Sequence, residues 1–224
     1  MLIEKMTELK RQLIEFTALI ESMIGKSIQG LLDKKEDLLK DVIESDEPRA
    51  NQYDREIDEL CTVLIAQFEP LARDLRTVLM ILKMNKDLER MGDHAVNISE
   101  SAIFLISRPF LRQASSDIRI MAQTTMTMLK DSINAFVNED VPLAAAVCER
   151  DSIVDHLGDT LLEELTGLMK GERDGIERSL HLMRISHNLE RVADLSTNIC
   201  EEVIYIVEGR DIKHHKGFSD RPAI

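Results

Sequence analysis

The sequence is poor in the residues that build sheets, tight loops and covalent frameworks. Among 224 residues there are 9 glycines, 5 prolines, 3 cysteines, 2 tyrosines, 6 phenylalanines and no tryptophan. Strands draw on aromatic and β-branched residues, whereas the Leu, Met, Glu, Lys and Arg that are abundant here lose little rotamer freedom in helices. The composition therefore predicts an all-α fold.

Two further absences narrow the class of protein. Cys61, Cys148 and Cys200 are widely spaced and form no CxxC motif, which is typical of a reduced, intracellular chain. The sequence contains no run of about 18 apolar residues, and charges interrupt its first residues, so we expect neither a membrane-spanning helix nor a signal peptide. The expected location is the cytoplasm.

Positive charge is also scarce. The 28 Lys and Arg residues are outnumbered by 41 Asp and Glu residues, which gives a formal net charge of −13. Nucleic-acid binding draws its affinity from Lys and Arg, so we expect no nucleic-acid partner. The sequence also lacks a glycine-rich phosphate loop, a GxSxG motif and a His-Glu-x-x-His motif, so we do not expect an enzyme.

What the sequence does contain is an eleven-residue phrase written twice. LERMGDHAVNI (88–98) and LERVADLSTNI (189–199) agree at six positions, and the second residues of the two phrases, Glu89 and Glu190, are 101 positions apart. An apolar seam with helical spacing runs through the first phrase, and seven of its eight positions remain apolar after a shift of 101: Ile81, Met84, Leu88, Met91, Ala95, Ile98, Ala102 and Leu105. We infer an internal duplication.

Prolines and glycines divide the chain into six expected helices. We expect them at 1–30, 33–67 with a break near Glu47-Pro48, 71–107, 112–138, 141–170 and 175–208. Short turns between helices favour antiparallel packing, so the pattern predicts two tandem antiparallel three-helix bundles, at 1–108 and 112–209. Residues 210–224 are expected to form a flexible tail.

The acidic residues of the phrase face away from the apolar seam. With Leu88 and Met91 on the seam, Glu89 and Asp93 project outward, so these acids cannot form a metal site in the bundle core. Antiparallel pairing across the last turn of the second unit places Asp155 level with Glu190, and Asp151 level with Asp194. Four carboxylates should then meet in the groove between two helices.

The same reasoning is less decisive in the first unit. A turn centred near Pro70 places Asn51 level with Glu89 and Glu47 level with Asp93. The pair Asp54 and Asp58 has the same spacing and outward phase, but it lies one heptad too close to the turn. We therefore prefer Glu47 and Asn51, with Asp54 and Asp58 as the rival pair.

Clustered carboxylates raise one another's pKa values unless a cation neutralises them. Hard oxygen donors favour Fe, Mn, Mg or Ca, and a nearby imidazole would favour Fe or Zn. The alternative is a solvated acidic face with salt bridges to Arg90 and Arg191, the arginines that follow Glu89 and Glu190 in the two phrases. We expect these arginines to hold the carboxylates or to contact a partner.

The paired phrases resemble the PhoU family of phosphate-signalling regulators, and VIESD (42–46), PLARDLR (70–76) and NICEEVIYIVEGRDIKH (198–214) extend the likeness over the whole chain. The resemblance implies two similar three-helix bundles that repress the phosphate-starvation response by contacting the phosphate importer's ATPase and a membrane sensor histidine kinase.

Some homologues carry iron or zinc clusters on acidic motifs. The family motif falls here on Glu89 and Asp93, Asp151 and Asp155, and Glu190 and Asp194. The resemblance thus implies a metal cation, Fe or Zn, on these residues.

Taken together, these observations lead us to expect a cytoplasmic, dimeric regulatory protein. Two other hypotheses stay open at this point: a metal-dependent oxidase or hydrolase with an exposed multinuclear site, and a metal-free helical scaffold.

Overall fold

Apolar seams with helical spacing determine the architecture. The computed structural model describes residues 2–108, 114–171 and 175–209, so the expected tail at 210–224 lies outside the described residues. All regular structure in this part of the chain is helical, which confirms the all-α prediction. The helices are α1 (Leu2–Asp33), α2 (Glu36–Asp41), α3 (Glu47–Phe68), α4 (Arg73–Ile106), α5 (Ala114–Asn138), α6 (Val141–Gly171) and α7 (Ile176–Glu208).

The expected break near Glu47-Pro48 is a π-helical turn. It spans Val42–Asp46 between α2 and α3, and the N–H of Glu47 donates to the carbonyl of Val42, five residues earlier. Pro48 has no N–H to offer the carbonyl of Glu44, and its ring would clash with that carbonyl in a regular helix. A wider turn avoids the clash and lets the chain continue in one direction.

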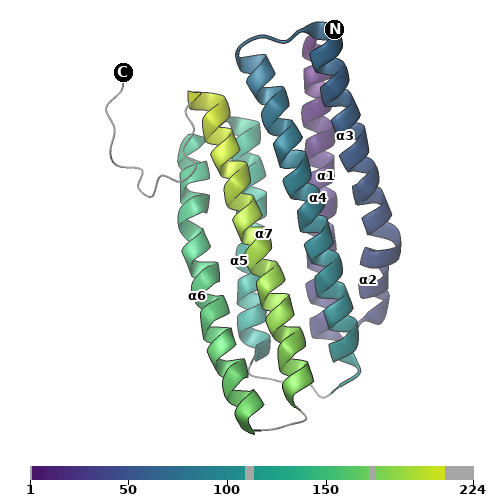
Figure 1. Ribbon diagram of the computed structural model, residues 1–224, viewed down its shortest axis with the longest axis vertical. Helices are drawn as coiled ribbons and strands as arrows, with labels where there is room; N and C mark the ends of the chain where they lie inside the picture. Colours follow the sequence, from purple (N-terminus) through teal and green to yellow (C-terminus); the bar gives the residue numbers. More distant parts are fainter. Residues whose placement is uncertain (1, 109–113, 172–174, 210–224) are drawn as a thin grey trace.

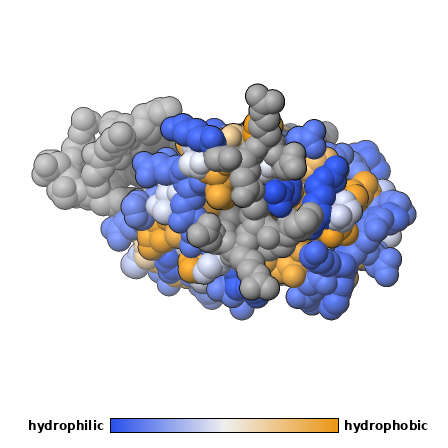
Figure 2. All heavy atoms as spheres, turned by 90° about the horizontal axis from the view of Figure 1, so that it is seen from below, coloured by the Kyte–Doolittle hydropathy of each residue, from blue (hydrophilic) through white to orange (hydrophobic). Residues whose placement is uncertain are grey.

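The helices form two units that lie side by side (Figure 1). The first unit comprises α1 to α4, and the second comprises α5 to α7. Every residue of the seam on α4, and every residue that a shift of 101 gives on α7, is buried. Seen from the end of the molecule, the surface of the described helices is mostly hydrophilic, with small separate hydrophobic patches (Figure 2).

The two units meet along α4 and α7, which run antiparallel (Figure 1). The rings of Phe104 and His181 stack with centroids 3.9 Å apart. The Nδ1 atom of His94 lies 2.8 Å from the Oδ1 atom of Asn188, which places a polar contact in the middle of the same interface. The two phrases therefore lie on α4 and α7, the helices that pack against each other between the units. The acidic residues of the phrases face the grooves on either side of this interface.

Candidate functional site

A carboxylate cluster lies in the groove between α6 and α7. It consists of Asp151 and Asp155 on α6 and Glu190 and Asp194 on α7. Burial, together with the charges of Asp155 and Asp194, raises the pKa of Asp151 to about 6. Burial also raises the pKa of Asp155, and the charges of Asp194 and Asp159 add to that rise. The acids expected to lie level across the turn are thus close enough to repel one another.

Glu190 lies directly against the backbone of α6. A Cβ atom at Gly158 would fall 1.8 Å from the Oε1 atom of Glu190, so a larger residue there would move this carboxylate from its present position. Burial raises the pKa of Glu190; the His187 ring, with Nδ1 3.6 Å from Oε2, opposes the rise, and the charges of Asp155 and Asp159 add to it. Gly158 and Asp159 therefore belong to the site, although neither stands in the repeated phrase.

A pocket of about 300 Å³ adjoins this part of the cluster. Its lining combines polar groups with leucine and methionine side chains: Gly158, Asp159, Leu161, Leu162, Met183, Ser186, His187 and Glu190. Imidazole and carboxylate donors thus border an open space between α6 and α7.

The donor chemistry of the cluster suits a hard cation. The Oδ1 atom of Asp151 is buried and has no hydrogen-bond partner among the described residues, so it is an acceptor without a donor. As the side chains lie, however, no three His, Cys, Asp or Glu residues in the described ranges converge closely enough to enclose a metal ion. The charges and donor types fit a cation, and the side chains would have to rotate to surround it.

The two phrase arginines have different partners. The Nη1 atom of Arg191 lies 2.8 Å from the Oδ2 atom of Asp194 and so ties one member of the cluster. The Nη1 atom of Arg90 lies 3.6 Å from the Oδ1 atom of Asp87, which precedes the phrase. The side chain of Arg90 is 57% exposed and that of Arg191 is 50% exposed, so each guanidinium group can also face a partner.

The first unit brings a different set of acids to α4. Burial raises the pKa of Glu89, and the charges of Asp93 and Asp54 add to the rise. Within the described residues, no hydrogen bond or ion pair joins Glu47 or Asn51 to Glu89 or Asp93. The acids of α3 that contact α4 are the rival pair, Asp54 and Asp58.

Both rival acids bind Lys86 on α4. The Nζ atom of Lys86 lies 2.9 Å and 3.0 Å from the two carboxylate oxygens of Asp54, and 2.7 Å from the Oδ2 atom of Asp58. The 101-residue shift relates Lys86 to His187, so the sequence reveals Lys86 as the counterpart of a histidine. It did not indicate that Lys86 pairs with these acids, because Lys86 lies outside the repeated phrase.

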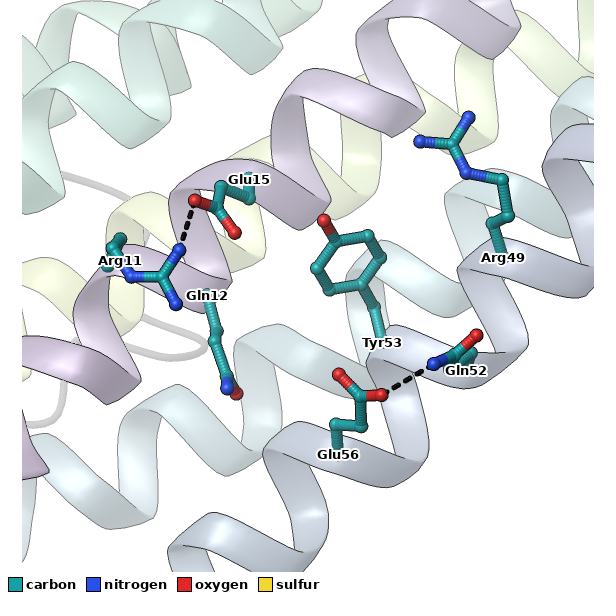
Figure 3. A pocket seen from close by; sticks show the side chains of 7 residues that line it. All are labelled: Arg11, Gln12, Glu15, Arg49, Gln52, Tyr53 and Glu56. Atoms are coloured by element: carbon teal, nitrogen blue, oxygen red, sulfur yellow. Dashed lines mark hydrogen bonds and ion pairs between the residues drawn. The ribbon is translucent and has the colours of Figure 1, made fainter.

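A second pocket, between α1 and α3, has balanced charges. It measures about 240 Å³ and contains two arginines, two glutamates, two glutamines and a tyrosine: Arg11, Gln12, Glu15, Arg49, Gln52, Tyr53 and Glu56. Figure 3 shows Arg11 turned onto Glu15, with the Tyr53 ring lying between Glu15 and Arg49. Because Arg11 also pairs with Glu8, this pocket has little uncompensated positive charge for an anion.

The raised pKa of Asp151 leads to a prediction for the protein in the absence of cations. An acid whose pKa rises on folding destabilises the folded protein once it is ionised. For Asp151 this cost grows as the pH rises from 3.8, its ordinary pKa, to about 6, and it persists at neutral pH. Asp151→Asn should therefore raise the free energy of unfolding at pH 7 by about 1 kcal/mol in chelator, a figure reduced for solvent screening of a partly exposed group. Urea denaturation measures this change. Glu163→Gln, at an exposed position of the same helix, should change it little, and a less stable Asp151→Asn variant would contradict the electrostatic interpretation.

Comparison with known proteins identifies the family. A family model described as the PhoU domain matches residues 13–102 and again residues 118–203. The chain is 32% identical over 209 residues to a phosphate-specific transport system accessory protein PhoU homologue of Thermotoga maritima, covering 93% of this chain and 90% of that one. It is 30% identical over 216 residues to the accessory protein PhoU of Escherichia coli, covering 95% and 88%.

Solved structures agree with this match. The crystal structure of PhoU from Pseudomonas aeruginosa superimposes with a TM-score of 0.90 at 30% identity, covering 94% of this chain and all of the other. That of the phosphate transport system regulatory protein PhoU from Streptococcus pneumoniae gives a TM-score of 0.87 at 27% identity, covering 95% of this chain. With both repeat units matched and the helices superimposed along nearly their whole length, the chain belongs to the PhoU family.

Proposed function

We propose that this chain is an accessory protein of a phosphate-specific transport system, and that it restrains phosphate uptake and the phosphate-starvation response through protein contacts. The observation that carries the proposal is the match of both units, over 93% of the chain, to a relative named as such an accessory protein. The family resemblance supplies the partners: the ATPase of the phosphate importer and a sensor histidine kinase, bound by a homodimer in the cytoplasm.

Recognition suits the surface of the molecule better than turnover does. The repeated acidic residues lie in grooves on the outside of the helices, where a partner can reach them, and not in a closed pocket that excludes water. No helix in the described ranges combines the length and apolarity needed to cross a bilayer. Contact with a membrane-bound importer and kinase would then pass through the surface of α4, α7 and their neighbours.

The carboxylate cluster is proposed to hold a metal cation, Fe or Zn, with Mn, Mg and Ca as other candidates. Asp151, Asp155, Glu190 and Asp194 would supply the oxygen donors. A bound cation supplies positive charge that offsets the repulsion among these groups. Because two donors lie on α6 and two on α7, they would then hold the two helices together instead of pushing them apart.

We also propose a role for Arg191, which pairs with one acid of the carboxylate cluster. Its ion pair with Asp194 competes with a cation for that carboxylate, so cation binding would free the guanidinium group. Arg90, at the same place in the first phrase, already has a longer contact with Asp87. We propose that Arg90 and Arg191 present planar donors to acidic groups on the partner proteins.

Removing two donors on opposite helices tests the metal proposal. Asp151→Asn with Asp194→Asn should lower the metal content by one site per chain in protein purified without chelators, measured by elemental analysis. A cation at about 100 times its Kd stabilises a folded protein by about 2.7 kcal/mol, so metal should raise the melting temperature of the parent chain but not of the double variant.

Gly158→Ala provides a subtler version of the same test. A Cβ there must displace Glu190, so this variant should bind the cation at least tenfold more weakly while keeping all four acids. Gly167→Ala, where a Cβ would meet nothing within 4 Å, is the matched control on the same helix. Equal metal content in the parent chain and the double Asp variant would favour the solvated acidic face.

The regulatory proposal is tested in a bacterium that lacks its own PhoU protein. The parent chain should restore repression of phosphate-starvation genes, and Arg90→Ala with Arg191→Ala should lose most of this repression while remaining folded by circular dichroism and retaining its metal. A parent chain that fails to complement but shows metal-dependent oxidase or hydrolase activity would overturn the regulatory proposal. Normal repression by the double variant would remove only the role of the arginines.

A further inference from the structure

The duplication relates two sets of side chains that have different charges. The shift of 101 positions that relates Glu89 to Glu190 also relates Asp54 to Asp155, Asp58 to Asp159 and Lys86 to His187. In both units the two acids lie on the first helix of a hairpin, α3 or α6, and the lysine or histidine lies on the second, α4 or α7. The first unit therefore has an ammonium group where the second has an imidazole ring.

In the first unit the acids are fully satisfied. Each of the four carboxylate oxygens of Asp54 and Asp58 accepts a hydrogen bond from Lys86 or Asn85. The ammonium group lies within 2.7–3.0 Å of three of these oxygens. Asn85 is buried, and its Nδ2 atom also donates to the backbone carbonyl of Asp54, which fixes the amide in place.

In the second unit the equivalent acids have no such donors. Within the described residues, no hydrogen bond or ion pair from a cationic side chain reaches Asp155 or Asp159. Ser186, which stands in place of Asn85, donates to the sulfur of Met121. His187 is turned to Glu190, with 59% of its side chain exposed.

The geometry points to one cation site per chain, not two. We propose that Lys86 is the resident cation of the first unit and excludes metal ions from its acidic groove, so that the chain takes a divalent cation only between α6 and α7. This inference rests on the proposed cation site of the second unit and adds the residue that makes the units unequal. His187 also offers that site a nitrogen donor in place of a fixed charge.

Lys86 keeps free cations away from Asp54 and Asp58 because it is part of the same chain. An ammonium group attached to α4 is present at a high effective concentration beside Asp54 and Asp58, and a free cation must displace it from three oxygens. Once displaced, the lysine would still place a positive charge near the entering ion. In the second unit an entering cation would meet no ammonium group, because among the described residues His187 is turned to Glu190 and Arg191 pairs only with Asp194.

Lys86→Met tests the proposal, because methionine keeps an unbranched apolar stem and lacks the charge. With Mn²⁺ as the probe, equilibrium dialysis should show one ion per parent chain and two per Lys86→Met chain. In chelator the variant should melt at a lower temperature than the parent, and Mn²⁺ should recover the difference. Lys40→Met, which breaks an exposed ion pair to Glu36, is the control and should leave the count at one.

The reciprocal variant, His187→Lys, places an ammonium group beside Asp155 and Asp159. It should weaken Mn²⁺ binding of the otherwise unchanged chain at least tenfold, and it decides the question alone if Lys86→Met does not fold. Two ions on the parent chain, one ion on Lys86→Met, or unchanged Mn²⁺ binding by His187→Lys would each overturn the role of Lys86. If neither the parent chain nor Lys86→Met binds Mn²⁺, the cation part of the proposed function fails together with this inference.

Discussion

The apolar seams of α4 and α7 constrain where every polar group of the repeated phrase can lie. Leu88 and Met91 in one phrase, and Leu189 and Val192 in the other, are completely buried. Because a helix turns by about 100° per residue, a buried seam obliges the acids between these positions to project sideways or outward. The duplicated acidic residues of this protein therefore lie in surface grooves, and its core is mainly apolar.

Acids that lie close together in a groove between antiparallel helices repel one another. In the first unit the protein supplies its own donors to Asp54 and Asp58, since Lys86 and Asn85 together donate to all four of their carboxylate oxygens. In the second unit, Arg191 reaches only Asp194, and the buried Oδ1 atom of Asp151 has no donor among the described residues. The first hairpin thus holds an ammonium group of its own among its acids, whereas the second lacks positive charge that a cation or a cationic partner group can supply.

Sequence reasoning located the helices well because periodicity and punctuation agree along this chain. Pro70, the residues around Pro142 and Gly209 mark helix ends within a few positions of those observed. It also placed Asp151 opposite Asp194, since the short turn between α6 and α7 leaves little freedom of pairing.

The first unit was harder to place from sequence. Its pairing was inferred from a turn centred near Pro70, which favoured Glu47 and Asn51 as partners of the phrase, whereas the contacts of α4 involve Asp54 and Asp58. Periodicity gives the face of a helix reliably but the height of a residue along it only roughly, and an error of one heptad, about two turns, exchanges Glu47 and Asn51 for Asp54 and Asp58. The shift of 101 relates Gly158 to Ile57 of the first unit. Periodicity does not reveal that Glu190 lies against the backbone at Gly158, where a Cβ atom would meet its carboxylate.

The most direct test of this account is an anomalous-difference map from crystals of the chain soaked in Mn²⁺ and measured at the manganese absorption edge. The account predicts a peak between α6 and α7, within coordination distance of Asp151, Asp155, Glu190 or Asp194, and none beside Lys86. A peak between Asp54 and Asp58, or no peak at the carboxylate cluster, would contradict it.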